Sequence, residues 1–345
     1  MAAVNLETFR VQQQISLDSA PAAVVAHPAK PKVFVLAPDA GTVYEIDAAT
    51  LAVSRRARPG NLAVDMLISP AGDSLWVLYR DPAMLVELPL DSLKPGRRVR
   101  FRSPPDSFDL SATKEDRVLA AVASRTDRTI ALASLGNAVV ERTIAAGVEP
   151  SLITFGQDGK HVITGNGPER SITIFDVATG KTVVRLPLPL APRHFCATTG
   201  GGQLFVTGDG MDAVVVVFPY LTEVYQTILA GRAPGAMAVA DDPSGPAYLM
   251  VANRETSGIT VLDIIDYTLV AIVAVGQGPG QILLTPAPER QYVLVLNETS
   301  GDLAVIRTRA LATTPNGALR RMKSAPLFTL IPVGERPVSA AVVTL

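Results

Sequence analysis

The sequence predicts an all-β protein built from one repeated four-stranded unit. Three observations lead to this prediction. Apolar runs restart at a regular spacing along the 345 residues, each interval holds four short strand-like segments, and no window keeps an apolar period of 3.6 residues long enough for a substantial helix. With 48% hydrophobic and 18% charged residues, the composition is that of a globular chain rather than a disordered one.

The starts of the apolar runs give the length of the repeat. Pro150, Pro192 and Pro234 each begin such a run and follow one another at intervals of 42 residues. Extending the pattern in both directions gives seven units, which we expect to form one domain over 1–345. The predicted units are 21–62, 63–104, 105–149, 150–191, 192–233, 234–278 and 279–336.

The unit at 150–191 shows its four strands most clearly. Runs rich in Val, Ile, Thr and aromatic residues alternate with turns that contain Gly, Asp or Asn. The predicted strands are Leu152–Phe155, His161–Thr164, Ile172–Asp176 and Thr182–Leu186. In a second unit the basic stretch "KPGRRVRFR" at 94–102 is interpreted as an outer strand, since cationic residues on an edge discourage pairing with another sheet.

Seven four-stranded units do not form one flat sheet, because twist accumulates from strand to strand. A radial arrangement avoids this problem, so we predict a seven-bladed β-propeller with four antiparallel strands in each blade. Terminal strands at 8–16 and 337–344 are expected to close the ring. Which of the two closes it is left open, and an eighth blade built from both is an alternative.

Several segments resemble the YVTN-type β-propeller repeat family of bacterial and archaeal surface-layer or periplasmic proteins. They are "DGKHVITGN", "SITIFDVATGKTVVRLPL" and "PAYLMVANRETSGITVLDIIDYTLVAIVAVG". The family's four-residue signature is degenerate here, as "VITGN" at 162–166, "LMVAN" at 249–253 and "VLVLN" at 293–297. The resemblance covers most of the chain and implies an extracytoplasmic location. The first residues contain no apolar leader, and a cytoplasmic location is the alternative.

Composition argues against several classes of function. A formal net charge of −1 and a pI near 6.3 are unlike a dedicated nucleic-acid-binding domain. No apolar run is long enough for a transmembrane helix. The single Cys196 and three separated histidines give none of the spacings of zinc sites, so we predict no cofactor and no metal. The basic segment 307–326 is interpreted as a long loop.

Polar residues at strand ends form the predicted binding site. In a propeller, the loops between the second and third strands and those leading into first strands meet at one mouth of the channel. The candidate ligand-binding residues are Arg80, Arg125, Asn166, Asp209, Asn253, Arg254, Asn297 and Glu298. We expect a monomeric, non-enzymatic protein that binds a protein, a peptide or a small ligand at this loop face, with arginines holding an anion or a peptide carboxylate.

The alternative is a lactonase- or lyase-type enzyme acting on a small acidic or cyclic substrate. Its weak catalytic candidates are His194, Asp65, Asp109 and Arg193, since such a reaction needs a base and a group that stabilises an oxyanion. Asp65 and Asp109 are interpreted as occupying the same repeat position, where the 150–191 unit has Leu152. A bound Ca²⁺ at the mouth, with Asp65, Asp109, Asp209 and Glu298 as ligands, is a less favoured variant.

Overall fold

The computed structural model describes residues 1–112, 117–241, 247–286, 291–311 and 326–344. It divides into two compact units. The four-blade unit consists of Leu17–Arg193, Phe218–Val224 and the last residues from Val343 onward. The three-blade unit consists of Met1–Ser16, His194–Val217 and Tyr225–Val342.

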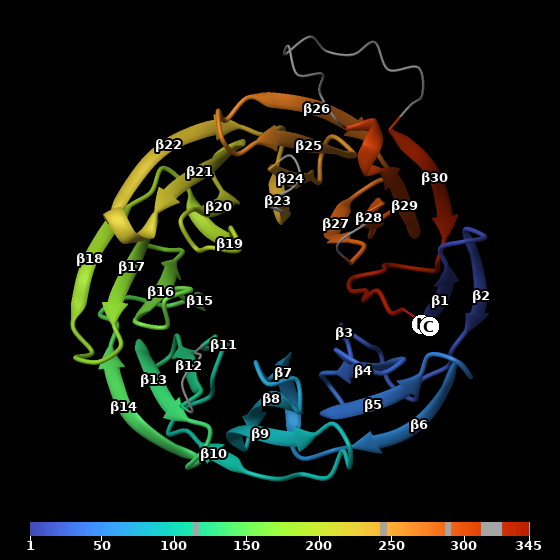
Figure 1. Ribbon diagram of the computed structural model, residues 1–345. Helices are drawn as coiled ribbons and strands as arrows, with labels where there is room; N and C mark the ends of the chain where they lie inside the picture. Colours follow the sequence, from blue (N-terminus) through green and yellow to red (C-terminus); the bar gives the residue numbers. More distant parts are fainter. Residues whose placement is uncertain (113–116, 242–246, 287–290, 312–325, 345) are drawn as a thin grey trace. The chain divides into compact units, whose positions relative to one another are not determined.

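Each blade is one antiparallel sheet of four strands, and blades 1 to 4 belong to the four-blade unit (Figure 1). Their strands are, for blade 1, β3 (Ala23–Ala26), β4 (Lys32–Ala37), β5 (Thr42–Asp47) and β6 (Ala52–Ala57); for blade 2, β7 (Asn61–Ile68), β8 (Ser74–Asp81), β9 (Ala83–Pro89) and β10 (Arg98–Arg100); for blade 3, β11 (Ser107–Leu110), β12 (Leu119–Ser124), β13 (Thr129–Ser134) and β14 (Val139–Ala145); and for blade 4, β15 (Leu152–Phe155), β16 (His161–Asn166), β17 (Ser171–Asp176) and β18 (Thr182–Pro187).

The three-blade unit holds most of blade 5 and all of blades 6 and 7, together with an N-terminal hairpin. Its strands are β19 (Ala191–Ala197), β20 (Leu204–Asp209), β21 (Ala213–Phe218) and β22 (Glu223–Leu229) in blade 5; β23 (Pro234–Ala240), β24 (Tyr248–Asn253), β25 (Gly258–Asp263) and β26 (Leu269–Ala274) in blade 6; β27 (Pro279–Leu284), β28 (Tyr292–Asn297), β29 (Asp302–Arg307) and β30 (Leu327–Pro332) in blade 7; and β1 (Ala2–Asn5) and β2 (Arg10–Gln14) in the hairpin.

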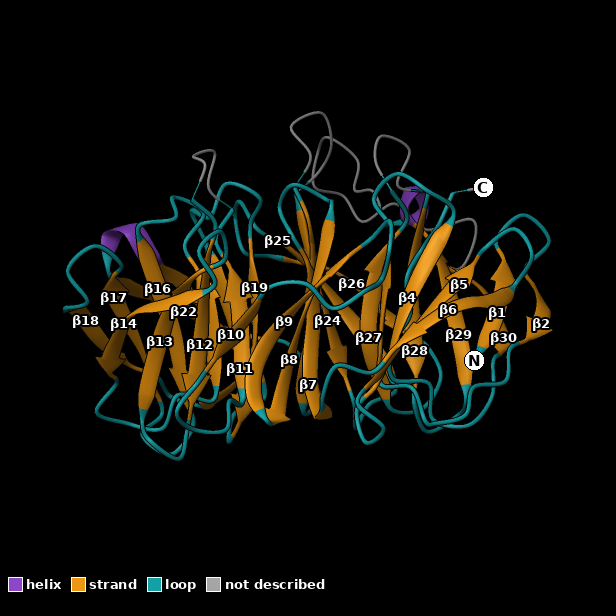
Figure 2. Ribbon diagram, turned by 90° about the horizontal axis from the view of Figure 1, so that it is seen from below, coloured by secondary structure: helices purple, strands orange, loops and turns teal. Residues whose placement is uncertain are grey.

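Strands make up nearly all of the regular structure (Figure 2). The described helices are two 3₁₀ turns, Pro219–Leu221 and Thr308–Ala310, so no helix in the described ranges has the length or the apolar character needed to span a membrane. The second and third strands are almost continuously buried, as in β24 with all six residues buried. First strands of successive blades lie next to each other, β11 beside β7 and β15 and β23 beside β27.

The predicted four-stranded blades are confirmed, and in the 150–191 unit every predicted strand is present to within two residues at each end. The basic stretch at 94–102 contains the outer strand β10, as expected. The ends of the chain differ from expectation. β1 was not foreseen, β2 pairs with β1 in a sheet of its own, and 337–344 form no strand. Ring closure and the single-domain assignment stay predictions.

Candidate functional site

Two of the predicted binding arginines, Arg80 and Arg125, share one carboxylate in the four-blade unit. Arg80 lies near the end of β8 and Arg125 directly follows β12, and both Nη2 atoms donate to Oδ1 of Asp106, at 2.8 and 3.0 Å. Oδ2 of Asp106 accepts the backbone N–H of Arg125 at 2.8 Å, and Nε of Arg80 donates to the carbonyl of Pro105 at 3.2 Å. The carboxylate therefore joins the loop ends of blades 2 and 3.

The charges of this Arg80–Asp106–Arg125 cluster do not cancel. The two guanidinium side chains are 44% and 50% exposed, whereas the Asp106 side chain is only 11% exposed. Within the cluster, two positive charges face one negative charge, so Asp106 balances only one of the two arginines. Asp127, on the same turn as Arg125, accepts a hydrogen bond from Ser103. The guanidinium N–H groups not used on Asp106 and Pro105 can bind a further acceptor.

The side chain of Asp109 connects blade 3 to blade 4 through hydrogen bonds. Its Oδ2 accepts hydrogen bonds from the hydroxyl of Thr154 at 2.9 Å and from the backbone N–H of Phe155 at 2.8 Å. Its Oδ1 accepts a hydrogen bond from the backbone N–H of Leu110 at 2.8 Å. Burial raises the pKa of this carboxyl, and the three hydrogen bonds offset only part of that effect. The side chain thus has an evident structural role.

The carboxylate of Asp65 accepts fewer hydrogen bonds than that of Asp109. Its Oδ1 accepts the N–H of Met66 at 2.8 Å. The residue is exposed to solvent, and partial desolvation by the surrounding protein raises the pKa of its carboxyl. Of the two predicted catalytic carboxylates, it has the larger unused acceptor capacity.

Asp65 and Asp109 do not occupy the same repeat position, which corrects the sequence alignment. Asp65 pairs with Leu78, five positions into the second strand, and so matches Leu152, which pairs with Gly165. Asp109 pairs with Ala121, three positions into its second strand, and so matches Thr154, which pairs with Ile163. Asp65 therefore matches Leu152 as expected, and the misaligned residue is Asp109, in a blade whose first two strands pair without a register shift. Asp109 lies four residues after Pro105, whereas Leu152 lies two residues after Pro150.

The three predicted asparagines are buried at the ends of their second strands. Nδ2 of Asn166 donates to Oγ of Ser171 and Oγ1 of Thr173, at 3.2 and 3.0 Å. Nδ2 of Asn253 donates to Oγ1 of Thr260 at 2.8 Å, and Nδ2 of Asn297 to Asp302 at 2.7 Å. Each amide therefore ties its second strand to the neighbouring third strand.

Glycines pack directly against two of these amides. A Cβ added to Gly231 would lie 2.7 Å from the side chain of Asn253, and one added to Gly276 would lie 2.7 Å from that of Asn297. The loops that lead into first strands thus cover the buried amides. The role as ligand-binding residues that the sequence suggested stays a prediction for all three asparagines.

Arg254 and Glu298 form the corresponding surface pair in the three-blade unit. Nη2 of Arg254, which follows β24, donates to Oε2 of Glu298, which follows β28, at 2.9 Å. Asp209 ends β20 and is exposed. Among the predicted ligand-binding residues of the described chain, Arg80 meets Arg125 at Asp106, and Arg254 meets Glu298.

The catalytic candidates are divided between the two units. Asp65, Asp109 and Arg193 belong to the four-blade unit, and His194 to the three-blade unit. Arg193 and His194 are consecutive, exposed residues of β19, so their side chains project from opposite faces of that strand. Within the described ranges, no group of three or more His, Cys, Asp or Glu residues is placed to hold a metal ion, and the calcium variant gains no ligand cluster.

Cys196 follows His194 on the same strand. Burial, with a smaller contribution from Asp241, raises the pKa of its thiol to about 11. The thiol is therefore protonated at neutral pH and packs among the apolar side chains of blades 5 and 6.

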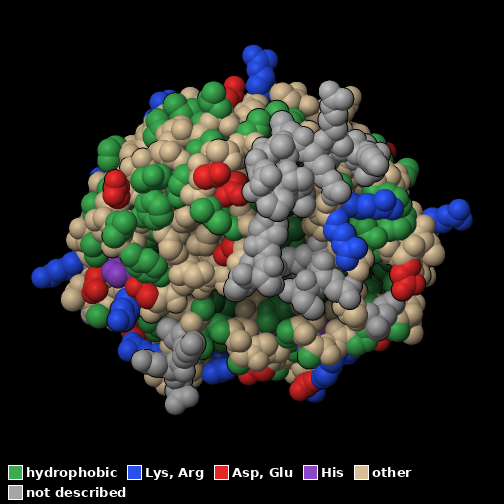
Figure 3. Space-filling model, turned by 45° about the horizontal axis from the view of Figure 1, so that its top comes forward, with side chains coloured by type: hydrophobic (Ala, Val, Ile, Leu, Met, Phe, Trp, Pro, Cys, Tyr) green, Lys and Arg blue, Asp and Glu red, His purple; other side chains and the backbone are tan. Residues whose placement is uncertain are grey.

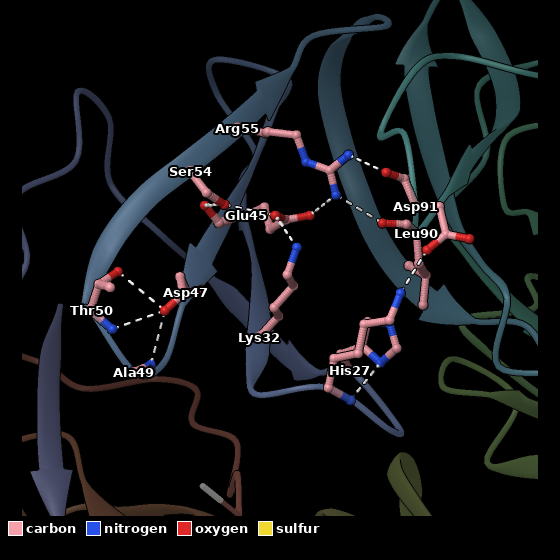
Figure 4. Close-up of polar contacts among 11 residues, drawn as sticks. His27, Lys32, Glu45, Asp47, Ala49, Thr50, Ser54, Arg55, Leu90 and Asp91 are labelled. Atoms are coloured by element: carbon pink, nitrogen blue, oxygen red, sulfur yellow. Dashed lines mark hydrogen bonds and ion pairs between the residues drawn. The ribbon is translucent and has the colours of Figure 1, made fainter.

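A polar network around Glu45 was missed by the sequence analysis (Figure 4). Glu45 is fully buried in β5. Its carboxylate accepts hydrogen bonds from the guanidinium of Arg55, from Oγ of Ser54 at 2.7 Å and from Nζ of Lys32 at 2.9 Å. Burial alone would raise its pKa, but the hydrogen bonds from Arg55, Lys32 and Ser54 outweigh that effect and lower the pKa to about 2. Glu87 is the matching residue of blade 2 and pairs with Arg97.

Arg55 also reaches the next blade, where it donates to the backbone carbonyls of Leu90 and Asp91. Nearby, burial and the positive charges of Lys30 and Lys32 lower the pKa of His27. In the sequence, the signal for this network is a glutamate among apolar residues in "TVYEID", followed by "SRR" on the next strand. The network connects blades 1 and 2 and is structural.

Comparison with known proteins supports the same architecture. No family model matches the chain. The chain is 27% identical over 135 residues to the seven-bladed β-propeller protein Rv1057 of Mycobacterium tuberculosis. The match covers 39% of this chain and about a third, 34%, of the length of that relative.

Similar solved structures are diverse. They include hydrazine synthase of Kuenenia stuttgartiensis, with a TM-score of 0.64 and 18% identity over 86% of this chain and 98% of that one. The dihydro-heme d1 dehydrogenase NirN has a TM-score of 0.71 and 15% identity, with 96% and 72% of the chains covered. The β-propeller domain of Cps50 (Swd1) from Myceliophteria thermophila has a TM-score of 0.60 and 17% identity, with 86% and 97% covered.

At these identities the solved structures show the fold and leave the function open. Seven four-stranded antiparallel sheets, together with these likenesses, establish that the chain has the fold of a seven-bladed β-propeller.

Proposed function

We propose that this protein is a non-enzymatic binding protein that recognises a carboxylate group, as in a peptide C-terminus or a small organic acid, at the loop end of blades 2 and 3. The observation that supports this proposal is the sharing of Asp106 by two half-exposed guanidinium groups, Arg80 and Arg125. Asp106 holds the guanidinium groups in place but neutralises only one of the two. A planar carboxylate matches the remaining N–H donors in charge and in geometry.

Asp106 pre-organises the two arginines for such a ligand. An arginine side chain loses considerable rotamer freedom when a ligand fixes it, and this loss reduces affinity. Here the hydrogen bonds to Asp106 and Pro105 already restrict both side chains. The cluster should therefore bind an anion more tightly than two unrestrained surface arginines would.

Thermal unfolding with matched ligands tests this function. The probes are succinate, citrate, and one short peptide made both with a free C-terminal carboxylate and with a C-terminal amide. A carboxylate ligand at 100 times its dissociation constant should stabilise the fold by about 2.7 kcal/mol, and the amidated peptide should not. The proposal fails if the wild-type protein responds to none of the carboxylates.

Substitutions in the protein test which residues bind the carboxylate ligand. Arg80→Gln with Arg125→Gln should abolish the response. Arg142→Gln, which alters an outer-strand arginine bonded to the carbonyls of Ala178 and Thr179, is the matched control and should leave it intact. Asp106→Asn should lower stability, because both arginines lose their anionic partner. An unchanged response in the double variant would place the binding elsewhere.

We also propose that the chain is a monomeric YVTN-type repeat protein outside the cytoplasm. Support comes from the three degenerate signature ends, where the final asparagine is buried in each case: Asn166, Asn253 and Asn297. A buried amide that bonds the neighbouring strand gives a physical reason for an asparagine at that position. Fractionation of the source cells, with detection by antibody, tests the location.

A further inference from the structure

The outer strand of blade 2, β10, has a row of arginines on one of its faces. Arg98 and Arg100 are exposed, whereas Val99 between them is fully buried. Val99 and the following Phe101 pack in an apolar cluster with side chains of blades 2 and 3. Since side chains alternate along a strand, Arg98, Arg100 and the exposed Arg102 project from the opposite face, away from that cluster.

These three guanidinium groups differ from those of the other outer strands in the four-blade unit. The arginines of β6, β14 and β18 all donate to carboxylates or to backbone carbonyls. Within the described ranges, the side chains of Arg98, Arg100 and Arg102 have no such partner. The outer strand of blade 2 therefore presents three unpaired positive charges at intervals of about 7 Å, the repeat of alternate residues in a strand.

β10 also has open backbone groups on its outer side. The carbonyl of Arg97 accepts a hydrogen bond from β9, and the N–H of Phe101 donates one to β9, both at 2.9 Å. Successive residues of an antiparallel strand direct their N–H and C=O groups to opposite sides, so those of Arg98 and Arg100 face away from β9. In the described part of the chain β10 pairs with β9 alone, which leaves these groups on an open edge (Figure 1).

The open backbone groups and the unpaired charges belong to the same residues, and this combination restricts the kind of partner. A nucleic acid or an anionic polysaccharide would use the guanidinium groups of Arg98 and Arg100 but not their backbone edge. A second copy of β10 would place arginines opposite arginines, and like charges at paired positions repel each other. An acidic strand uses both sets of groups, because its backbone completes the ladder and its carboxylates lie opposite the arginines.

We propose that β10 is a docking site for an extended acidic segment of a partner protein, which adds to blade 2 as a fifth antiparallel strand. Backbone hydrogen bonds to Arg98 and Arg100 hold the segment in place. Carboxylates at alternate positions pair with Arg98, Arg100 and Arg102, and they select this partner over an apolar or a basic strand. The docking site does not include the Arg80–Asp106–Arg125 cluster, so it does not depend on the carboxylate-binding function.

A designed peptide tests the docking site by calorimetry. The probe is acetyl-Gly-Glu-Val-Glu-Val-Glu-Val-Gly-amide, which has carboxylates at alternate positions and no terminal charge. It should bind saturably and slow the amide exchange of 98–100. A peptide of the same composition with the order Glu-Glu-Glu-Val-Val-Val is the control for charge, and it should bind more weakly because its carboxylates do not all lie on one face.

Methyl groups on the peptide backbone test strand addition directly. When the glutamates lie opposite the arginines, their N–H groups face β10 and those of the valines face solvent. Methylation of the glutamate nitrogens should therefore abolish binding, whereas methylation of the valine nitrogens should be tolerated. Equal binding by the two methylated peptides would mean that charge alone attracts the peptide, as it would a nucleic acid or a polysaccharide, and would overturn the proposal.

Variants of the protein locate the bound peptide. Arg98→Gln with Arg100→Gln should weaken binding about tenfold, the loss expected from two cross-strand charge pairs. This protein should unfold like the wild type, because neither guanidinium group has a partner to lose. Arg56→Gln, which alters an exposed outer-strand arginine of blade 1, is the matched control and should bind normally. The Arg80→Gln, Arg125→Gln protein should also bind the probe, so failure of the carboxylate site and failure of this site are distinguishable.

Three further results would contradict the docking site. The first is the absence of saturable binding to the wild-type protein. The second is amide exchange in 98–100 that is already slow without peptide, because the edge would then be occupied within the protein itself. The third is unchanged binding by the Arg98→Gln, Arg100→Gln protein, which would place the peptide on another surface.

Discussion

The outer strands of the two units connect neighbouring blades with different chemistry. Every fourth strand of the four-blade unit contains arginine, at Arg55 and Arg56, Arg98 and Arg100, Arg142, and Arg185. The fourth strands of blades 5, 6 and 7, with sequences EVYQTIL, LVAIVA and LFTLIP, contain neither Lys nor Arg. Their exposed side chains include Leu229, Leu269 and Ile272, at 81%, 55% and 69%.

The same turn of the next blade is contacted in both units. Arg142 donates to the carbonyls of Ala178 and Thr179 in the turn between the third and fourth strands of blade 4, at 3.0 and 2.9 Å. In the three-blade unit the contact is aromatic, since the rings of Tyr225 and Tyr267 lie 5.5 Å apart. One architecture thus accepts either cationic or aromatic contacts between blades.

An outer strand without Lys or Arg leaves an apolar edge at the surface. Charged edge residues prevent a sheet from pairing with another sheet, and an uncharged apolar edge lacks that protection. Figure 3, in which the top of Figure 1 comes forward, shows apolar side chains in patches with scattered charged groups between them. β26 is the extreme case, because none of its six residues is polar.

Removing the charge of Glu45 should produce the largest effect on the four-blade unit. Glu45→Gln leaves Arg55 and Lys32 without their buried partner, and it should lower the free energy of unfolding by about 3 kcal/mol. Urea denaturation measures the loss. Asp18→Asn, which breaks the exposed pair with Arg56, is the control and should cost at most about 0.5 kcal/mol. Equal losses in the two variants would contradict a special role for the buried pair.

The pH dependence of stability should follow the same carboxylate. The pKa of Glu45 is about 2 in the folded state and near 4.5 when unfolded. The stabilisation is therefore complete above pH 4.5 and is lost as the pH falls from 4.5 toward 2. The wild-type protein should lose stability faster than Glu45→Gln over this range in acid titrations monitored by circular dichroism. Parallel curves would contradict the assignment.

The sequence predicted the blades better than it predicted these contacts. Strand positions follow from runs such as "LITF" and "SITIFDV", because apolar content and turn residues are local properties. The partners of Arg80 and Glu45 depend on which residues of the next blade lie opposite, and that depends on register. Asp109 was assigned to the position of Leu152, although the register places it at that of Thr154. The hairpin β1 was missed because "AAVN" is short and only weakly apolar.

The aromatic contact should be weaker than the buried ion pair. Tyr225→Ala removes the ring contact with Tyr267 and should lower the free energy of unfolding by about 1 kcal/mol. Tyr225→Phe keeps the ring and should be close to neutral. Urea denaturation of both variants checks the contribution of the ring. A similar loss in Tyr225→Phe would show that the hydroxyl, and not the ring, is responsible.

Placing a charge on the apolar edge should change association more than stability. Ile272→Lys on β26 gives this strand the kind of residue that the other unit carries, and it should alter the free energy of unfolding by no more than about 0.5 kcal/mol. It should reduce concentration-dependent association, measured by light scattering at rising protein concentration. Val183→Lys on β18, which already has Arg185 nearby, should change association little.

The smallest effect on the free energy of unfolding is expected at Asp65, where the substitution should stabilise the protein instead of destabilising it. Desolvation raises the pKa of this carboxyl in the folded protein, so its ionised form opposes folding. That penalty is absent below pH 3.8 and appears as the pH rises through the raised pKa. Asp65→Asn should therefore match the wild-type protein near pH 3 and be only slightly more stable at pH 7, because solvent screening limits the penalty at this exposed residue. Denaturation at both pH values measures the difference. Asp109→Asn should not gain stability at pH 7, because an amide cannot accept all three of the hydrogen bonds that Asp109 receives. A loss of stability in Asp65→Asn at pH 7 would mean that the ionised carboxylate has a favourable partner.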